Sequence, residues 1–245
     1  MRFLGASIFV VLAAAISDVG AQYTNDTSSR QKLLTGGTVV TYNTTSSSVS
    51  VLRNANLLIE GGQIIYVSNQ HPNNLRSDAE TINMEGKIIT PGFVDTHRHG
   101  WQTAFRTIGS NTTLVDYFVK YGASGPASTN FTAEDIYVGQ LVGIYEAINT
   151  GVTSILDFAH HTWSTEKSLA GLQGSVDSGA RVWWSYAIQQ LSNGFSIDEQ
   201  FVDLEDIVRN KKDLWDDTNV EIGLAYDRFV DGPSEEVERV LNTAQ

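Results

Sequence analysis

The chain has 245 residues, of which 28 are acidic and 16 are basic, so its formal net charge is −12. Apolar side chains make up 41% of the chain and charged ones 18%, which is typical of a globular protein with a sizeable core. The acidic balance argues against a nucleic-acid-binding protein, because phosphate contacts need clustered lysine and arginine. The chain has no cysteine, which excludes disulfides and thiolate chemistry, so any metal ion must be held by histidine and carboxylate groups.

Residues 1–21 have the three-part pattern of a secretory signal peptide. Met1-Arg2 is a short positive start, Phe3 to Ile16 is almost wholly apolar, and Val19-Gly20-Ala21 is a small-residue cleavage site. The apolar run is shorter than the roughly 20 residues that span a bilayer, which makes an uncleaved membrane anchor the less favoured alternative. We therefore expect a secreted, extracellular protein without membrane attachment once the signal peptide is removed.

Four N-glycosylation sequons follow the signal peptide, and together they favour a eukaryotic secretory route and a glycoprotein. Their acceptor residues are Asn25, Asn43, Asn111 and Asn130.

Residues 32 to about 90 show short apolar runs and tight turns, the pattern of a small β domain. Gly61-Gly62 separates two such runs and predicts a two-residue hairpin turn. Thr44 to Ser48 is a polar loop, and His71 lies in another, where we expect an ordinary surface histidine. Nothing catalytic is visible in this part of the chain.

After Gly86 the pattern changes to strands that alternate with helices. Thr132 and Asp135 predict a capped helix start, and Ser234 is expected to cap the last helix. The expected strands lie at residues 87–95, 153–158, 181–188 and 220–226, and Pro91-Gly92 interrupts the first of them. Four successive strand–helix units predict an α/β fold with a parallel sheet. No strand is followed by a glycine-rich phosphate loop, so a nucleotide-binding doubly wound sheet is less favoured.

Candidate chemistry is concentrated at His97-Arg98-His99, at the end of the first strand of this series. Side chains alternate faces along a strand, so His97 and His99 point the same way and could grip one metal ion. Arg98 is expected to pair with a carboxylate. The pattern alone is weak, since two histidines can share a surface by chance, but barrel enzymes do place their chemistry at such strand ends.

A second group, Asp157 to His161, ends the next strand, and parallel strands bring such ends together at one rim. The alternative is that one of its histidines caps a loop while the other packs in the core.

The chain resembles the metal-dependent amidohydrolase superfamily, in particular the branch of aminohydrolases, heterocycle deaminases and chlorohydrolases. Three blocks carry the resemblance, and they are ordered and spaced as in that branch. They are Leu34 to Val40 with Ala55 to Ile64, Pro91 to His99 continuing to Thr103, and Gly151 to Asp157 with His160.

The resemblance implies a (β/α)8 barrel preceded by an N-terminal β-sandwich segment, here residues 22–86. It also implies one divalent metal ion, Zn²⁺ or alternatively Fe²⁺, that activates a water molecule to attack the carbon of a C–N or occasionally a C–Cl bond in a small molecule. His97 and His99 would be metal ligands, while Trp101, Gln102 and His160 would line the substrate pocket. Asp157 could orient a histidine or be a structural strand-end residue.

Members of that branch take a third histidine ligand from the fifth strand, an acid–base residue from the fifth or sixth, and an aspartate from the eighth. A full barrel takes about 250 residues, whereas only four strands are expected here. We therefore expect residues 87–245 to be the N-terminal half of a barrel in a truncated chain. Such a chain would be inactive or depend on a complementing C-terminal half or on a homo-oligomer.

Two other interpretations remain open. The chain could be a non-catalytic secreted glycoprotein, a decayed or repurposed relative of these hydrolases. It could also be a carbohydrate-active barrel that uses Asp157 and Asp227 at strand ends, although paired carboxylates would not explain His97 and His99.

Overall fold

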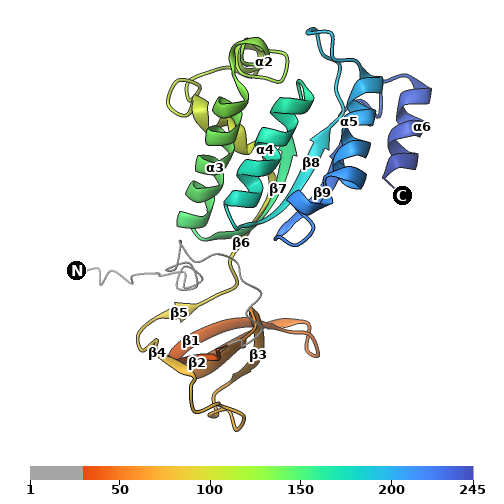
Figure 1. Cartoon of the computed structure of the whole chain (residues 1–245). Coiled ribbons are helices and arrows are strands. Elements are labelled where there is room, and N and C mark those ends of the chain that lie inside the picture. Colours follow the sequence, from red (N-terminus) through yellow and green to blue (C-terminus); the bar gives the residue numbers. More distant parts are fainter. Residues whose placement is uncertain (1–29, 245) are drawn as a thin grey trace. The chain divides into compact units, whose positions relative to one another are not determined.

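The computed structural model describes residues 30–244 of the chain, which separate into two compact units at the boundary between Gly92 and Phe93. Figure 1 shows a sheet in the first unit and a layer of strands and helices in the second. The expected signal peptide and the sequon at Asn25 lie outside the described residues. No helix within residues 30–244 is both long and apolar enough to cross a membrane.

The first unit is a single mixed sheet of five strands, with the order β3-β2-β1-β4 and with β5 also pairing with β1. Strands β1, β2 and β3 are antiparallel neighbours, whereas β4 and β5 run parallel to β1. The strands are β1 (Lys32–Asn43), β2 (Ser48–Glu60), β3 (Gln63–Ser68), β4 (Glu80–Asn83) and β5 (Ile88–Ile89). Gly61 and Gly62 form the predicted hairpin turn with φ of 57° and 77°, a conformation that glycine adopts without steric cost.

The expected strand at residues 87–95 is in fact two strands that belong to different sheets. Ile88–Ile89 pairs with β1 in the first unit, whereas β6 (Phe93–Arg98) opens the sheet of the second. Pro91 has no backbone N–H to donate to a sheet, and Gly92 tolerates backbone conformations that other residues avoid. The apolar run is therefore broken at Pro91-Gly92, between the end of β5 and the start of β6. The first unit therefore extends to Gly92, beyond the boundary that was expected at residue 86.

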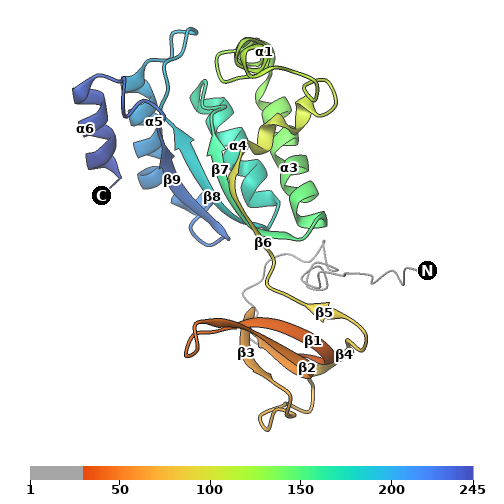
Figure 2. The same cartoon turned by 180° about the vertical axis from the view of Figure 1, so that it is seen from behind.

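The second unit is built on four parallel strands in the order β6-β7-β8-β9. The other three strands are β7 (Val152–Ala159), β8 (Arg181–Ala187) and β9 (Val220–Ala225). Helices α3 (Ala133–Asn149), α4 (Thr165–Asp177), α5 (Ile197–Asn210) and α6 (Ser234–Thr243) follow the strands in turn. In Figure 2 the strands lie in front of the helices, so α3, α4 and α5 cover one face of the sheet. This is the arrangement of part of a (β/α)8 barrel, as predicted.

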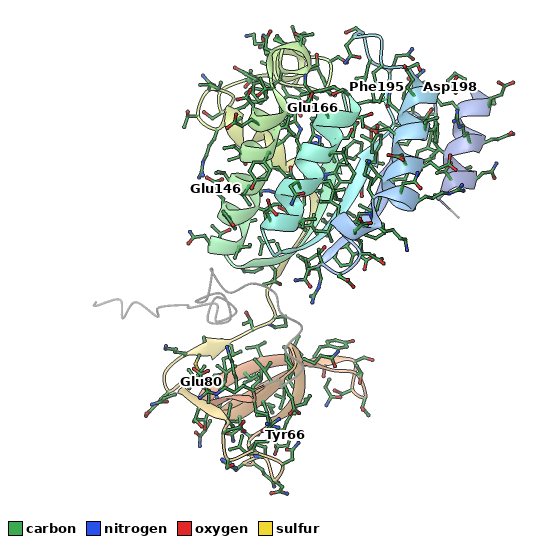
Figure 3. All side chains as sticks on the ribbon, viewed as in Figure 1. Tyr66, Glu80, Glu146, Glu166, Phe195 and Asp198 are labelled. Atoms are coloured by element: carbon green, nitrogen blue, oxygen red, sulfur yellow. The ribbon has the colours of Figure 1, made fainter. Side chains whose placement is uncertain are left out.

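Local signals account for the starts of these helices. Thr132 and Asp135 form the predicted reciprocal capping box of α3. The prediction for Ser234 was wrong, because Pro233 is the capping residue and Ser234 is already the first helical residue. Proline is favoured near this point because its fixed φ suits a helix start. Glu166 and Asp198 lie in the first turns of α4 and α5, where negative charge is stabilising, and Figure 3 labels both on the helices.

The segment between β6 and α3 contains structure that the sequence pattern did not predict. It holds η2 (Gly100–Phe105), α1 (Leu114–Lys120) and α2 (Ala127–Asn130). These short elements lie at the carboxyl end of the sheet, where Figure 2 labels α1. Of these elements, α1 lines the site described next.

The core of the second unit lies between the sheet and its helices. Ile155 of β7 and Trp184 of β8 are both buried there, against Ile144 of α3 and Leu172 of α4. The residues that alternate with them, such as Leu156 and Trp183, are partly exposed on the other face. This face alternation fixes the direction of every strand-end side chain.

Candidate functional site

His97 and His99 lie together at the carboxyl end of β6, as the strand alternation predicted. Their ring centroids are 4.9 Å apart, with the rings nearly perpendicular. Both side chains line a cavity of about 530 Å³ in the second unit. The pairing of β6 with β7 is irregular between Asp95 and Arg98, which turns the strand as it reaches the histidines.

The ring of His99 is held in one tautomer. Its Nδ1 lies 2.8 Å from the carbonyl oxygen of Phe158 on β7. A carbonyl oxygen can only accept, so Nδ1 carries the proton and Nε2 keeps its lone pair. Burial lowers the pKa of His99, partly opposed by this hydrogen bond. Histidine binds metals as a neutral imidazole in which one ring nitrogen is free and the other donates a hydrogen bond.

His160 lines the same cavity, as predicted, and packs against His99. The two ring centroids are 4.0 Å apart, and His160 is only 6% exposed. Burial, reinforced by repulsion from His99, holds the pKa of His160 well below its usual value. His160 is therefore neutral, able both to donate and to accept one hydrogen bond.

Asp157 is completely buried and does not hydrogen-bond to an imidazole. Its Oδ1 accepts from the backbone N–H of Gly100 at 2.9 Å, and its Oδ2 accepts from Gln140 Nε2 at 2.7 Å. Burial raises the pKa of Asp157 to about 6, against these two hydrogen bonds. Asp157 therefore does not orient a histidine side chain, which was one of the two roles considered for it. It binds the backbone N–H of Gly100, the residue after His99.

Arg98 pairs with Asp95 at 3.3 Å, as expected, and its Nη2 donates to the carbonyl oxygen of Gly143 at 2.8 Å. It is a structural tether between β6 and α3 rather than a cavity residue.

Trp101 and Gln102 do not line the cavity, contrary to what the resemblance implied. Trp101 is 0% exposed and packs against Trp163 and Ile136 in a separate core cluster. Gln102 donates to the carbonyl oxygen of Tyr121 at 2.7 Å and accepts from Tyr117 Oη at 3.0 Å. The 3-10 helix after His99 turns both side chains away from the cavity.

Other cavity walls come from residues that the sequence analysis did not assign to a metal-dependent site. Tyr117 and Phe118 of α1 form an aromatic wall, whereas Gln189, Asp227 and Arg228 supply polar groups from the ends of β8 and β9. Arg228 Nη1 is fixed by Gln190 at 2.9 Å. Gln189, Asp227 and Arg228 come directly after predicted strands. That position was the sequence signal that could have found them, because the carboxyl ends of barrel strands all meet at one rim.

The carboxylate pair considered from the sequence is not available for glycoside chemistry. Asp157 is buried with both oxygens engaged, and only Asp227 reaches the cavity. Within residues 30–244 there is also no group of three or more histidine, aspartate or glutamate side chains that could hold a metal ion. Within the described part of the chain, His97 and His99 thus form a pair without a third candidate ligand beside them.

Comparison with known proteins gives both sequence and fold relatives. The chain is 31% identical over 137 residues to a 5'-deoxyadenosine deaminase of Methanosarcina acetivorans, covering 55% of this chain and 30% of that protein. It is 28% identical over 149 residues to a 5-methylthioadenosine/S-adenosylhomocysteine deaminase of Symbiobacterium thermophilum, covering 60% and 33% respectively. The chain thus spans about a third of the length of these curated relatives.

Solved structures share the fold at lower identity. A guanine deaminase from C. acetobutylicum with bound guanine superposes with a TM-score of 0.69 at 20% identity, over 87% of this chain and 50% of that one. A zinc-bound adenosine deaminase from Xanthomonas campestris gives 0.63 at 17%, over 88% and 47%. A triazine hydrolase from Arthobacter aurescens gives 0.64 at 22%, over 87% and 50%.

The family assignment rests on more than half of the chain. The sequence model of the amidohydrolase family matches residues 88–236, which include β6 with its two histidines and the whole series of strands and helices as far as the start of α6. Members of this family typically bind a divalent metal ion. The fold, the position of the histidine pair and this match agree, and the chain belongs to the amidohydrolase family.

Proposed function

We propose that this protein is a metal-dependent hydrolase of carbon–nitrogen bonds that removes an amino group from a small aminated heterocycle. The observation that carries the proposal is the His97–His99 pair at the carboxyl end of the first barrel strand, with the His99 ring fixed so that Nε2 is free. A purely structural histidine would instead have both ring nitrogens engaged or buried.

The residues fit a divalent ion, for which we propose Zn²⁺ with Fe²⁺ as the alternative. Two imidazoles share one cavity, and nitrogen ligands of this kind suit zinc. A metal ion held there would lower the pKa of a water molecule and so supply hydroxide near neutral pH. Further ligands and the acid–base residue would have to come from outside the described residues.

The cavity matches a planar ring that carries polar edges. Phe118, Tyr117 and Phe158 provide apolar, aromatic surface on which a heterocycle can stack. His160 can donate or accept a hydrogen bond at the ring edge. Gln189 can accept one through Oε1, because its Nε2 already donates to the carbonyl oxygen of His160 and to Thr162 Oγ1. The names of the relatives support this substrate class, since deoxyadenosine, methylthioadenosine, guanine and triazine all contain a nitrogen heterocycle.

We also propose that the protein is secreted and glycosylated, on the basis of its N-terminal pattern and its sequons. Asn43, Asn111 and Asn130 are all exposed, so each is accessible to a glycan. Treatment of the purified protein with a peptide N-glycosidase should lower its mass, and Asn→Gln variants should lower it stepwise. An unchanged mass in secreted material would contradict glycosylation.

The test of the enzymatic proposal is metal content together with ammonia release. We expect the protein, purified together with a complementing C-terminal half, to contain zinc. In that complex the His97→Ala and His99→Ala variants should lose zinc together with ammonia release from aminopurines, aminopyrimidines or aminotriazines. His71→Ala is the matched control, because His71 is an exposed loop histidine of the first unit and should leave both readouts unchanged. Absence of metal and of ammonia release in the wild type would favour a non-catalytic glycoprotein instead.

A further inference from the structure

Gln140 is a polar side chain in the middle of the otherwise apolar buried face of α3. It is 0% exposed, and its Nε2 donates to Asp157 Oδ2 at 2.7 Å and to Ser175 Oγ at 3.0 Å. Polar side chains are seldom fully buried unless they hold something in place, because each lost hydrogen bond to water must be replaced. Gln140 does not line the cavity that contains His97 and His99.

What Gln140 holds is the residue pair that fixes His99. Its partner Asp157 accepts from the N–H of Gly100, and the next residue of β7, Phe158, accepts from His99 Nδ1. Two consecutive residues of β7 therefore bind two consecutive residues after β6. Asp157 uses its side chain to bind the backbone of Gly100, and Phe158 uses its backbone to bind the side chain of His99. The position of the His99 ring depends on this double contact.

Close packing against α3 makes the same loop rigid from the other side. A Cβ atom at Gly100 would lie 2.6 Å from Gln140 Oε1, and one at Gly139 would lie 2.5 Å from the carbonyl oxygen of Trp101. A Cβ atom at Gly143 would overlap the carbonyl oxygen of Gly100. These glycines allow α3 to touch the loop, and Gln140 fills the space directly beneath it.

We propose that Gln140 is a positioning residue for the metal site, which acts through Asp157 and Gly100 to keep the His99 ring in place with Nε2 directed to the ion. The metal role of His99 in this statement rests on the proposed function. The contact between Gln140 and the loop does not, since it is present in the protein without an ion.

The chemistry of the pair requires a donor such as Gln140. A carboxylate withdrawn from water is stabilised only if both oxygens receive hydrogen bonds. Gly100 supplies one donor and Gln140 the other. Without Gln140, Asp157 would be left with an unpaired buried oxygen and would turn or draw in water, and Gly100 would move with it.

The experiment compares Gln140→Met with the wild-type protein, because methionine has nearly the same length and volume but no amide. In metal-free protein we expect nitrogen-15 NMR to show His99 losing its Nδ1–H tautomer, and hydrogen exchange at the Gly100 amide to become at least about tenfold faster. Zinc affinity should fall by about 10- to 100-fold, the usual effect of losing an outer partner of a ligand.

Gln200→Met is the matched control, since Gln200 is equally buried and its Nε2 donates to two backbone carbonyls. It should lower stability without changing the His99 tautomer. Asp157→Asn keeps an acceptor for Gly100, and its Nδ2 can donate to Gln140 Oε1 once the Gln140 amide turns over, so the wild-type tautomer should persist. Asp157→Leu should abolish the Nδ1–H tautomer of His99.

Two results would overturn the proposal. One is a Gln140→Met protein with wild-type His99 tautomer and Gly100 exchange. The other, which serves if that variant does not fold, is an Asp157→Leu protein with the same two wild-type readouts. Failure of the metal role is distinguishable, because wild-type protein would then bind no zinc while the tautomer still responded to Gln140→Met.

Discussion

The imidazole of His161 lies directly against Gly171 of α4, so closely that a methyl group at Gly171 would overlap ring atoms Cε1 and Nε2. His161 is 0% exposed, and neither of its ring nitrogens has a hydrogen-bond partner among the described residues. His160 and His161 are thus neighbours with opposite surroundings, one at the cavity and one in the core.

Gly171→Ala should destabilise the second unit by about 1–3 kcal/mol, the usual cost of overpacking a core. The added methyl group cannot be accommodated unless His161 or α4 moves. All five tryptophans lie in the second unit, so urea unfolding followed by tryptophan fluorescence reports on this unit alone. The double variant Gly171→Ala, His161→Ala should recover part of the loss, because the clash is gone; a single variant as stable as wild type would contradict the contact.

The burial of His161 makes stability depend on pH. Burial lowers its pKa from the ordinary 6.5 to about 3, so the unfolded chain binds a proton that the folded chain does not. The contribution of neutral His161 is therefore fully present above pH 6.5 and is lost as pH falls toward 3, by about 4–5 kcal/mol in total. His161→Leu should flatten the fall in the free energy of unfolding between pH 6.5 and 4. An unchanged acid slope would show that other groups dominate.

Trp101 should matter for folding rather than for substrate binding. Trp101→Ala removes a fully buried indole and should cost about 3–5 kcal/mol in stability. Trp183→Ala is the control, because Trp183 is 42% exposed on the other face of the sheet and should cost far less. Thermal unfolding followed by circular dichroism measures both. If Trp101→Ala proved stable but failed to bind substrate, the core assignment would be wrong.

The capping box of α3 predicts a smaller effect. Thr132→Ala removes the side chain that accepts from the backbone N–H of Asp135, and should cost about 1 kcal/mol. Thr165→Ala, an exposed threonine in the first turn of α4, should be nearly neutral. Equal losses in the two variants, measured by urea unfolding, would argue that the cap contributes nothing specific.

Periodicity and capping signals are local, and apart from the cap at Ser234 they were read correctly from the sequence. The hairpin at Gly61-Gly62, the start of α3 at Thr132, and the four parallel strands were all predicted. The shared face of His97 and His99 followed from strand alternation alone. Each of these features is determined by residues within a few positions of one another, so the sequence suffices.

Side-chain environments were less accessible, because they depend on partners far away in the chain. Asp157 binds an amide 57 residues earlier, and His99 binds a carbonyl 59 residues later. No local pattern shows that the loop after His99 turns Trp101 into the core. The interruption at Pro91-Gly92 was visible in the sequence, but not that the two pieces of the run join different sheets.

The sequence by itself therefore determined the strand and helix series and the histidine pair, since both follow from short-range periodicity. Only the tertiary structure decided which side chains face the cavity, which are buried beneath it, and that Gln140 lies under the His99 loop. Packing of α3 against η2 and β7 sets those relations, and packing joins residues that the sequence keeps apart.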